Sequence, residues 1–229
     1  MASSASSPSD LSPDAPVYQG QFGEFAITRS DRQGVILYRT GLAIAAVSFA
    51  IATGIVLGIS PLSTGWLTGI TVLYGLFSLG LGLSLWTIHI YLRPLHRALQ
   101  AFWGIGTISA LVLAIAAPEP LAAAVFYHPA LLWGMGFTFA ALTGIFFKEA
   151  FCFDRLETKL LTPLVPLLLL GHMTSILTTP WEKAGLAVWA ILLLVFAARK
   201  CIQPIPPDIG DKSVFEYLER QRTEIRTEA

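Results

Sequence analysis

Charged and aromatic side chains alternate in one short segment, FKEAFCFDRLETK, at residues 147–159. A second polar segment, RPLHR, lies earlier in the chain, at residues 93–97. Side chains of this kind beside a membrane bind a partner protein, an anionic lipid headgroup or a phosphate. The plain alternative is a salt-bridged loop. The predicted docking residues are Arg93, His96, Arg97, Lys148, Glu149, Asp154, Arg155, Glu157 and Lys159.

A single histidine, His172, lies within a long apolar run and is a candidate axial ligand for a haem or a chlorin. The small neighbours Gly171, Thr174 and Ser175 would leave room for such a group. The alternative is a hydrogen bond to a neighbouring helix. No cofactor is identified by any longer motif.

Enzyme motifs are absent: the sequence has no HExxH zinc site, no GxSxG nucleophile turn and no phosphate-binding loop. The residues His96, Cys152 and Glu149 are the conceivable participants in a reaction at the membrane surface. Two cysteines, Cys152 and Cys201, are too few for a metal cluster, and we expect free thiols. We therefore expect a non-catalytic protein, and no nucleic acid among its partners.

The elements that carry these residues follow from charge-free runs. The chain has 229 residues, of which 54% are hydrophobic and 13% charged, whereas soluble domains carry about 25% charged residues. Residues 40–92 contain no charge, and residues 98–147 contain only Glu119. Runs of this length cross a bilayer as helices, because a helix needs about 20 apolar residues to span it and satisfies its own backbone hydrogen bonds in lipid.

The sequence therefore predicts an all-α polytopic membrane bundle of six transmembrane helices. Thr28 or Ser30 would cap the first. The last has the shortest uncharged part, so a five-helix chain is the alternative. The predicted ranges are residues 35–59, 66–92, 95–116, 129–151, 159–177 and 181–201.

The basic residues fix an orientation for six helices. All 15 lysines and arginines except Lys183 fall on the side of the N-terminus. The positive-inside rule assigns that side to the cytoplasm, so we expect both termini there.

Three regions result: a partly disordered cytoplasmic tail at residues 1–30, the six-helix domain at 31–202, and a cytoplasmic tail with a short helix at 203–229. Small residues recur at helical spacing, among them Gly54 and Gly58 in the first predicted helix and Gly80 in the second. We expect them to pack helices inside the bundle, and a homo-oligomeric face is the alternative.

Two long segments, FKEAFCFDRLETKLLTPLVPLLLLGH and GLSLWTIHIYLRPLHRALQ, resemble a cyanobacterial family of integral membrane proteins that is catalogued as a domain of unknown function. The resemblance extends from about Gly20 to about Pro207. It implies a thylakoid or plasma membrane location and transfers no catalytic residue. We predict an accessory or assembly partner of a membrane complex, with a photosynthetic complex as the candidate, in contact with membrane lipids. The alternatives are a small-solute transporter or channel and a chlorin- or haem-binding protein.

Overall fold

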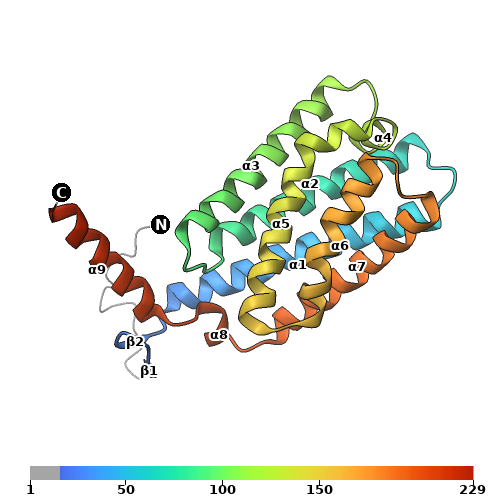
Figure 1. Cartoon of the computed structure of the whole chain (residues 1–229). Helices are drawn as coiled ribbons and strands as arrows, with labels where there is room; N and C mark the ends of the chain where they lie inside the picture. The colour runs from blue at the N-terminus through green and yellow to red at the C-terminus, as the bar shows by residue number, and fades with distance from the viewer. Residues whose placement is uncertain (1–15, 229) are drawn as a thin grey trace.

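The computed structural model describes residues 16–228, and the first residues of the predicted disordered tail lie outside this range. It is a bundle of long helices with a small module at one end (Figure 1). The long helices are α1 (Arg29–Gly58), α2 (Thr64–Thr87), α3 (Arg93–Ala116), α5 (Leu132–Phe153), α6 (Leu156–Met173) and α7 (Thr179–Ile202). A short helix, α4 (Leu121–Tyr127), and a 3₁₀ turn, η2 (Pro129–Leu131), connect α3 to α5.

Within the described residues, five helices are long and apolar enough to cross a membrane: α1, α2, α3, α7, and α5 together with its preceding turn. The predicted helix at residues 181–201, expected to be the weakest, is the full-length helix α7. Among the six long helices, α6 is outside this set; it has 18 residues and contains Pro163 and Pro166.

The helix ends are set by local chemistry. Thr28 caps α1 as predicted, and Asp31 completes the capping box, so the helix begins six residues before the predicted Val35. Helix α2 ends at Thr87, five residues before the predicted end, because Ile88 to Leu92 are extended up to the start of α3. Pro94 lies in the first turn of α3, where its missing N–H costs nothing.

The bundle core is apolar and aromatic. It joins α1, α2, α5, α6 and α7, with Leu42, Leu81, Ile145, Leu161 and Leu193 among its fully buried members. At mid-height the space between the helices is filled by four aromatic rings. Phe49 lies 4.4 Å from Trp189, and Phe77 lies 5.6 Å from Phe139, between ring centroids.

Helices α1 and α2 touch at Gly41 and Gly80. A Cβ added at Gly80 would lie 2.6 Å from the Gly41 carbonyl oxygen, so the backbones leave no room for a side chain. Gly80 is one of the small residues predicted to pack helices, whereas Gly54 and Gly58, also predicted, have open space where a Cβ would be. The expectation that this pair packs helices within the bundle was therefore wrong, because both face outward.

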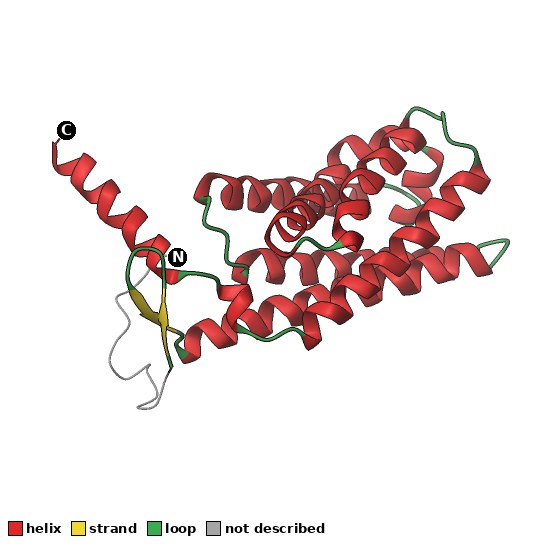
Figure 2. Cartoon of the chain, turned by 60° about the horizontal axis from the view of Figure 1, so that its bottom comes forward, coloured by secondary structure: helices red, strands yellow, loops and turns green. Residues whose placement is uncertain are grey.

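The tail module combines both ends of the chain. It consists of the hairpin β1 (Val17–Gln19) and β2 (Glu24–Ala26) with the helices α8 (Pro206–Ile209) and α9 (Lys212–Glu228). The hairpin and α9 lie beside the N-terminal end of α1, and α9 extends beyond the outline of the bundle (Figures 1 and 2). The hairpin is unpredicted, since residues 1–30 were expected to be a partly disordered tail.

Contacts between the two chain ends hold the module together. The Gln21 amide donates to the Asp211 carboxylate at 2.6 Å, and the Phe22 amide donates to Ser213 Oγ at 3.0 Å. Asp211 also accepts from the Ser213 amide at 2.9 Å, so it caps the start of α9.

Candidate functional site: a buried ion cluster

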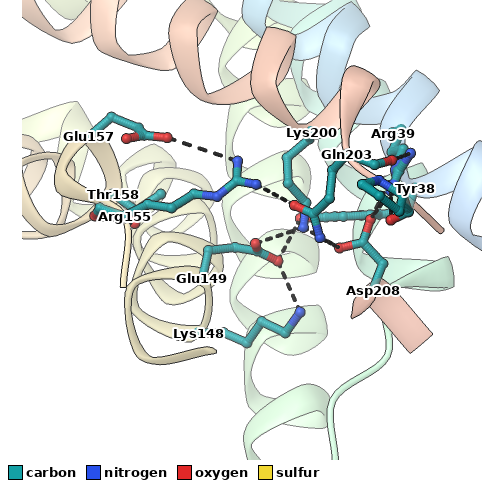
Figure 3. A network of polar contacts seen from close by, with 11 residues as sticks. Tyr38, Arg39, Lys148, Glu149, Arg155, Glu157, Thr158, Lys200, Gln203 and Asp208 are labelled. Carbon is teal, nitrogen blue, oxygen red and sulfur yellow. Dashed lines mark hydrogen bonds and ion pairs between the residues drawn. The ribbon is translucent and has the colours of Figure 1, made fainter. Parts of the chain in front are cut away.

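A group of charged side chains lies where α1, α5, α6, α7 and α8 meet (Figure 3). We call this end of the bundle, where α1 begins and α7 ends, the basic end. We call this group the ion cluster. Its charged members are Arg39, Lys148, Glu149, Arg155, Glu157, Arg199, Lys200 and Asp208, with Tyr38 and Gln203 as neutral members.

Lys200, near the end of α7, is the centre of the ion cluster. Its side chain is 0% exposed, and its Nζ lies 2.8 Å from Glu149 Oε2 and also contacts Asp208. The ammonium lies 4.2 Å from the centroid of the Phe153 ring. Two carboxylates and an aromatic face therefore replace the water that a lysine ammonium normally binds.

Glu149, on the last turns of α5, is equally buried. Its Oε1 accepts from the Tyr38 hydroxyl at 3.1 Å and from Lys148 Nζ at 2.9 Å. The carbonyl of Tyr38 in turn accepts from Ser84 Oγ at 2.9 Å, which ties this level of α1 to α2.

Asp208 of α8 brings the tail into the ion cluster. Arg39 donates to it from Nε at 2.9 Å and from Nη2 at 2.6 Å. The same guanidinium donates to the main-chain oxygens of Gln203 at 2.6 Å and Pro204 at 2.9 Å. Arg39 therefore caps the last turn of α7 and holds α8 at once.

Arg155, Glu157 and Arg199 form the part of the ion cluster at the seam between α6 and α7. Arg199 Nη1 donates to Glu157 Oε2 at 2.9 Å, and Arg155 Nη1 lies 3.9 Å from Glu157 Oε1. Arg155 also donates to Gln203 Oε1. The Arg199 side chain is 51% exposed, whereas the Arg155 side chain is 10% exposed.

The ion cluster holds five cations and three anions, from the ion pairs named above. The ion cluster is suited to fixing helix ends, because its paired charges replace the hydration that burial removes. It is also suited to binding anions, because its cations outnumber its carboxylates. Within residues 16–228, no three His, Cys, Asp or Glu side chains gather as a metal site requires.

The predicted docking residues separate into two groups. The side chains of Lys148, Glu149, Arg155 and Glu157 are at most 11% exposed and belong to the ion cluster.

The other docking residues lie outside it. Lys159 and Asp154 form an exposed pair, Arg93 pairs with Glu219 of α9, and Arg97 is exposed. His96 Nε2 lies 2.6 Å from the Leu85 carbonyl oxygen, which fixes the α2–α3 connection.

His172 lies in the last turn of α6, at the opposite end of the bundle from the ion cluster. Its Nδ1 lies 2.7 Å from Glu182 Oε1 in the first turn of α7. A carboxylate on Nδ1 leaves Nε2 as the nitrogen that could bind a metal.

Sequence reasoning missed Lys200, Arg39, Asp208 and Tyr38. Lys200 lies within the last predicted helix, residues 181–201, and was not among the predicted docking residues. A signal did exist, because it is a lysine at the end of an apolar helix with a Pro-rich segment and an aspartate after it.

Aromatic residues mark two levels about one bilayer apart. Trp66 and Trp86 on α2 are 45% and 63% exposed. They are 20 residues apart along the chain, which is about 30 Å in a helix and matches the hydrocarbon thickness. Trp133 and Trp181, at the first turns of α5 and α7, are 71% and 70% exposed.

The membrane-length apolar helices, with tryptophans at their ends, define an integral membrane protein of the helical class. A family model described as "uncharacterized integral membrane protein (DUF2301)" matches residues 83–217, more than half of the chain. The chain belongs to this family. No curated protein sequence and no solved structure matches it.

Proposed function

We propose that the chain crosses the membrane six times, with α6 as the fifth crossing. Contacts at both of its ends support this. Glu157 meets Arg199 at one end of α6, and His172 meets Glu182 at the other. The 15 residues from Glu157 to His172 rise about 22 Å, and the 17 residues from Glu182 to Arg199 rise about 25 Å. Helix α6 therefore covers nearly the same height as the membrane-length helix α7.

The proposed orientation puts the basic end in the cytoplasm. The ion cluster, the tail module and the α2–α3 connection hold the basic side chains there, and Lys183 near the start of α7 is the one basic residue assigned to the other side. This asymmetry supports an inward N-terminus and C-terminus under the positive-inside rule.

The two natural cysteines test this topology. Cys152 ends α5 and Cys201 ends α7, and both are exposed free thiols. If α6 and α7 both cross the membrane, the two thiols lie on the same side. If α6 does not cross, only α7 separates them, and the thiols lie on opposite sides. Cys152→Ser and Cys201→Ser variants, labelled with a membrane-impermeant maleimide in sealed right-side-out vesicles, should both resist labelling until the vesicles are opened. Labelling of one variant alone would refute six crossings.

We further propose that the protein is a non-catalytic accessory or assembly partner of a membrane complex. The observation that carries this proposal is an aromatic pair on the tail module. The rings of Phe22 and Tyr217 stack at 4.0 Å with an angle of 4°, and these residues remain 45% and 37% exposed. In the proposed topology lipid does not cover the tail module, so this apolar surface is suited to binding a partner protein.

Co-purification tests the partner. A tagged protein solubilised from native membranes in a mild detergent should recover specific proteins, and Phe22→Ser should reduce that recovery severalfold. The matched control is Val17→Ser, because Val17 is a 64% exposed apolar residue of the same hairpin that makes no such stack. Recovery of the protein alone at every detergent strength would contradict the proposal.

Ligation of a haem or chlorin by His172 is the second candidate, because Glu182 engages only Nδ1. An absorption spectrum of the purified protein tests it, and a colourless protein would remove it. The filled aromatic centre around Trp189 does not favour a solute path, so transport remains an untested alternative. The cyanobacterial source and the thylakoid or plasma membrane also remain predictions.

A further inference from the structure

The seam between α6 and α7 at the basic end gathers more positive than negative charge. Two guanidiniums, those of Arg155 and Arg199, converge on the single carboxylate of Glu157, which is 4% exposed. Arg155 Nη1 is buried and has no hydrogen-bond partner in the described part of the chain. Each arginine carries five N–H donors, so one carboxylate cannot satisfy both. Glu157 Oε1, which lies 3.9 Å from Arg155 Nη1, is also buried without a hydrogen-bond partner in the described residues. The seam therefore carries one positive charge more than its single carboxylate balances.

The level of the seam is that of the lipid headgroups. Arg199 lies 18 residues after Trp181 on α7, which is about 27 Å and close to one hydrocarbon thickness. Apolar side chains around it face outward: Leu156 is 67% exposed, Leu160 48% and Ile202 83%. The exposed half of Arg199 therefore lies beside a surface suited to acyl chains.

From this arrangement we infer that the α6–α7 seam binds the phosphate of an anionic phospholipid in the leaflet at the basic end. Arg199 binds the phosphate from the lipid side, and the buried charge of Arg155 behind it adds to the positive potential at this point. Glu157 pairs with both guanidiniums and balances only one of their two positive charges. Lys159, 49% exposed on the same outward stripe of α6, adds charge at the rim. This inference relies on the proposed crossing of α6 and is independent of any protein partner.

A lipid fits better than free phosphate because the apolar residues adjoin the arginines. Leu156 and Leu160 precede and follow Lys159 on one face of α6 at helical spacing. A free phosphate would gain nothing from these side chains, whereas a phospholipid places its acyl chains against them. Anionic lipids should therefore be preferred over zwitterionic ones with the same chains.

The test reconstitutes the full chain in vesicles of equal phosphatidylglycerol and phosphatidylcholine, extracts it in mild detergent and measures the retained lipids by native mass spectrometry. Wild type should be enriched in phosphatidylglycerol. One lost arginine contact with an anionic surface is worth about 1 kcal/mol, so Arg199→Gln should lower the enrichment about fivefold. Glu157→Gln removes the competing carboxylate and should raise it.

The matched control is Arg97→Gln, because Arg97 is an exposed arginine near the start of α3 at the same end. It should change the enrichment less than twofold. An equal loss in Arg97→Gln and Arg199→Gln would mean a diffuse surface potential and would overturn the site.

A second arm tests inorganic phosphate with protein in vesicles of phosphatidylcholine alone. Thermal stabilisation by phosphate in wild type but not in Arg199→Gln, with equal phosphatidylglycerol enrichment in both, would assign the seam to free phosphate and refute the lipid. Arg199 is half exposed, so its variant should fold even if Glu157→Gln does not.

Discussion

Replacing Lys200 by methionine would remove the centre of the ion cluster while keeping a side chain of similar length. Breaking a buried ion pair by removing one partner costs about 3–5 kcal/mol, because the other charge remains buried. Here Glu149 retains Lys148 and Tyr38, and Asp208 retains Arg39. We therefore expect the lower end, about 3 kcal/mol of unfolding free energy.

The control is Lys159→Met, which breaks the exposed pair with Asp154. The side chains of that pair are 49% and 86% exposed, so its loss should cost less than about 1 kcal/mol. The same substitution at two sites separates loss of a buried charge from loss of a lysine.

The double variant Lys200→Met with Glu149→Gln provides the sharper measurement. Both central charges are then gone, so the double variant should be more stable than the sum of the two single losses predicts. The assay is unfolding in mixed detergent with increasing SDS, followed by tryptophan fluorescence. Equal losses for Lys200→Met and Lys159→Met, or full additivity in the double variant, would refute the reasoning.

Three further outcomes follow from the fold. Gly80→Val should cost about 1–3 kcal/mol through overpacking against α1, whereas Gly54→Val, with open space around it, should leave the thermal midpoint in detergent nearly unchanged. Burial lowers the pKa of His89, in the α2–α3 connection, below its ordinary value of 6.5. The unfolded chain therefore binds more protons, so stability should fall as the pH drops below about 6.5, and His89→Gln should flatten that slope. Arg39→Lys should release the tail, since lysine cannot reach Asp208 and two carbonyl oxygens together; faster proteolysis after Ile202 would show it, and unchanged cleavage would contradict it.

The long helices were predictable because each consists of a charge-free run with turn residues at its ends. The Thr28 cap was predictable for the same local reason, since the threonine directly precedes the helix and Asp31 follows three residues later. The C-terminal end of α2 at Thr87 was not predictable, because Ile88 and Ile90 lie outside the helix and are buried in the core.

The ion cluster could not be predicted from local patterns. Tyr38 and Glu149 are 111 residues apart, and Arg39 and Asp208 are 169 residues apart. Residue types at these separations give no periodic signal. The hairpin was missed for a related reason, because its strands have three residues each and depend on Asp211 and Ser213 from the far end of the chain.

The contacts of Arg39 can form only late in the synthesis of the chain. Its acceptors on Gln203, Pro204 and Asp208 emerge from the ribosome only after more than 160 further residues, since the Arg39 and Gln203 groups are 164 residues apart. At about 5–20 residues per second this takes roughly 8–33 seconds. During that interval the first helix must be held at the membrane with its guanidinium in water or on lipid. A nascent chain that stops before Asp208 would leave Arg39 on α1 without the carboxylate that joins it to α8.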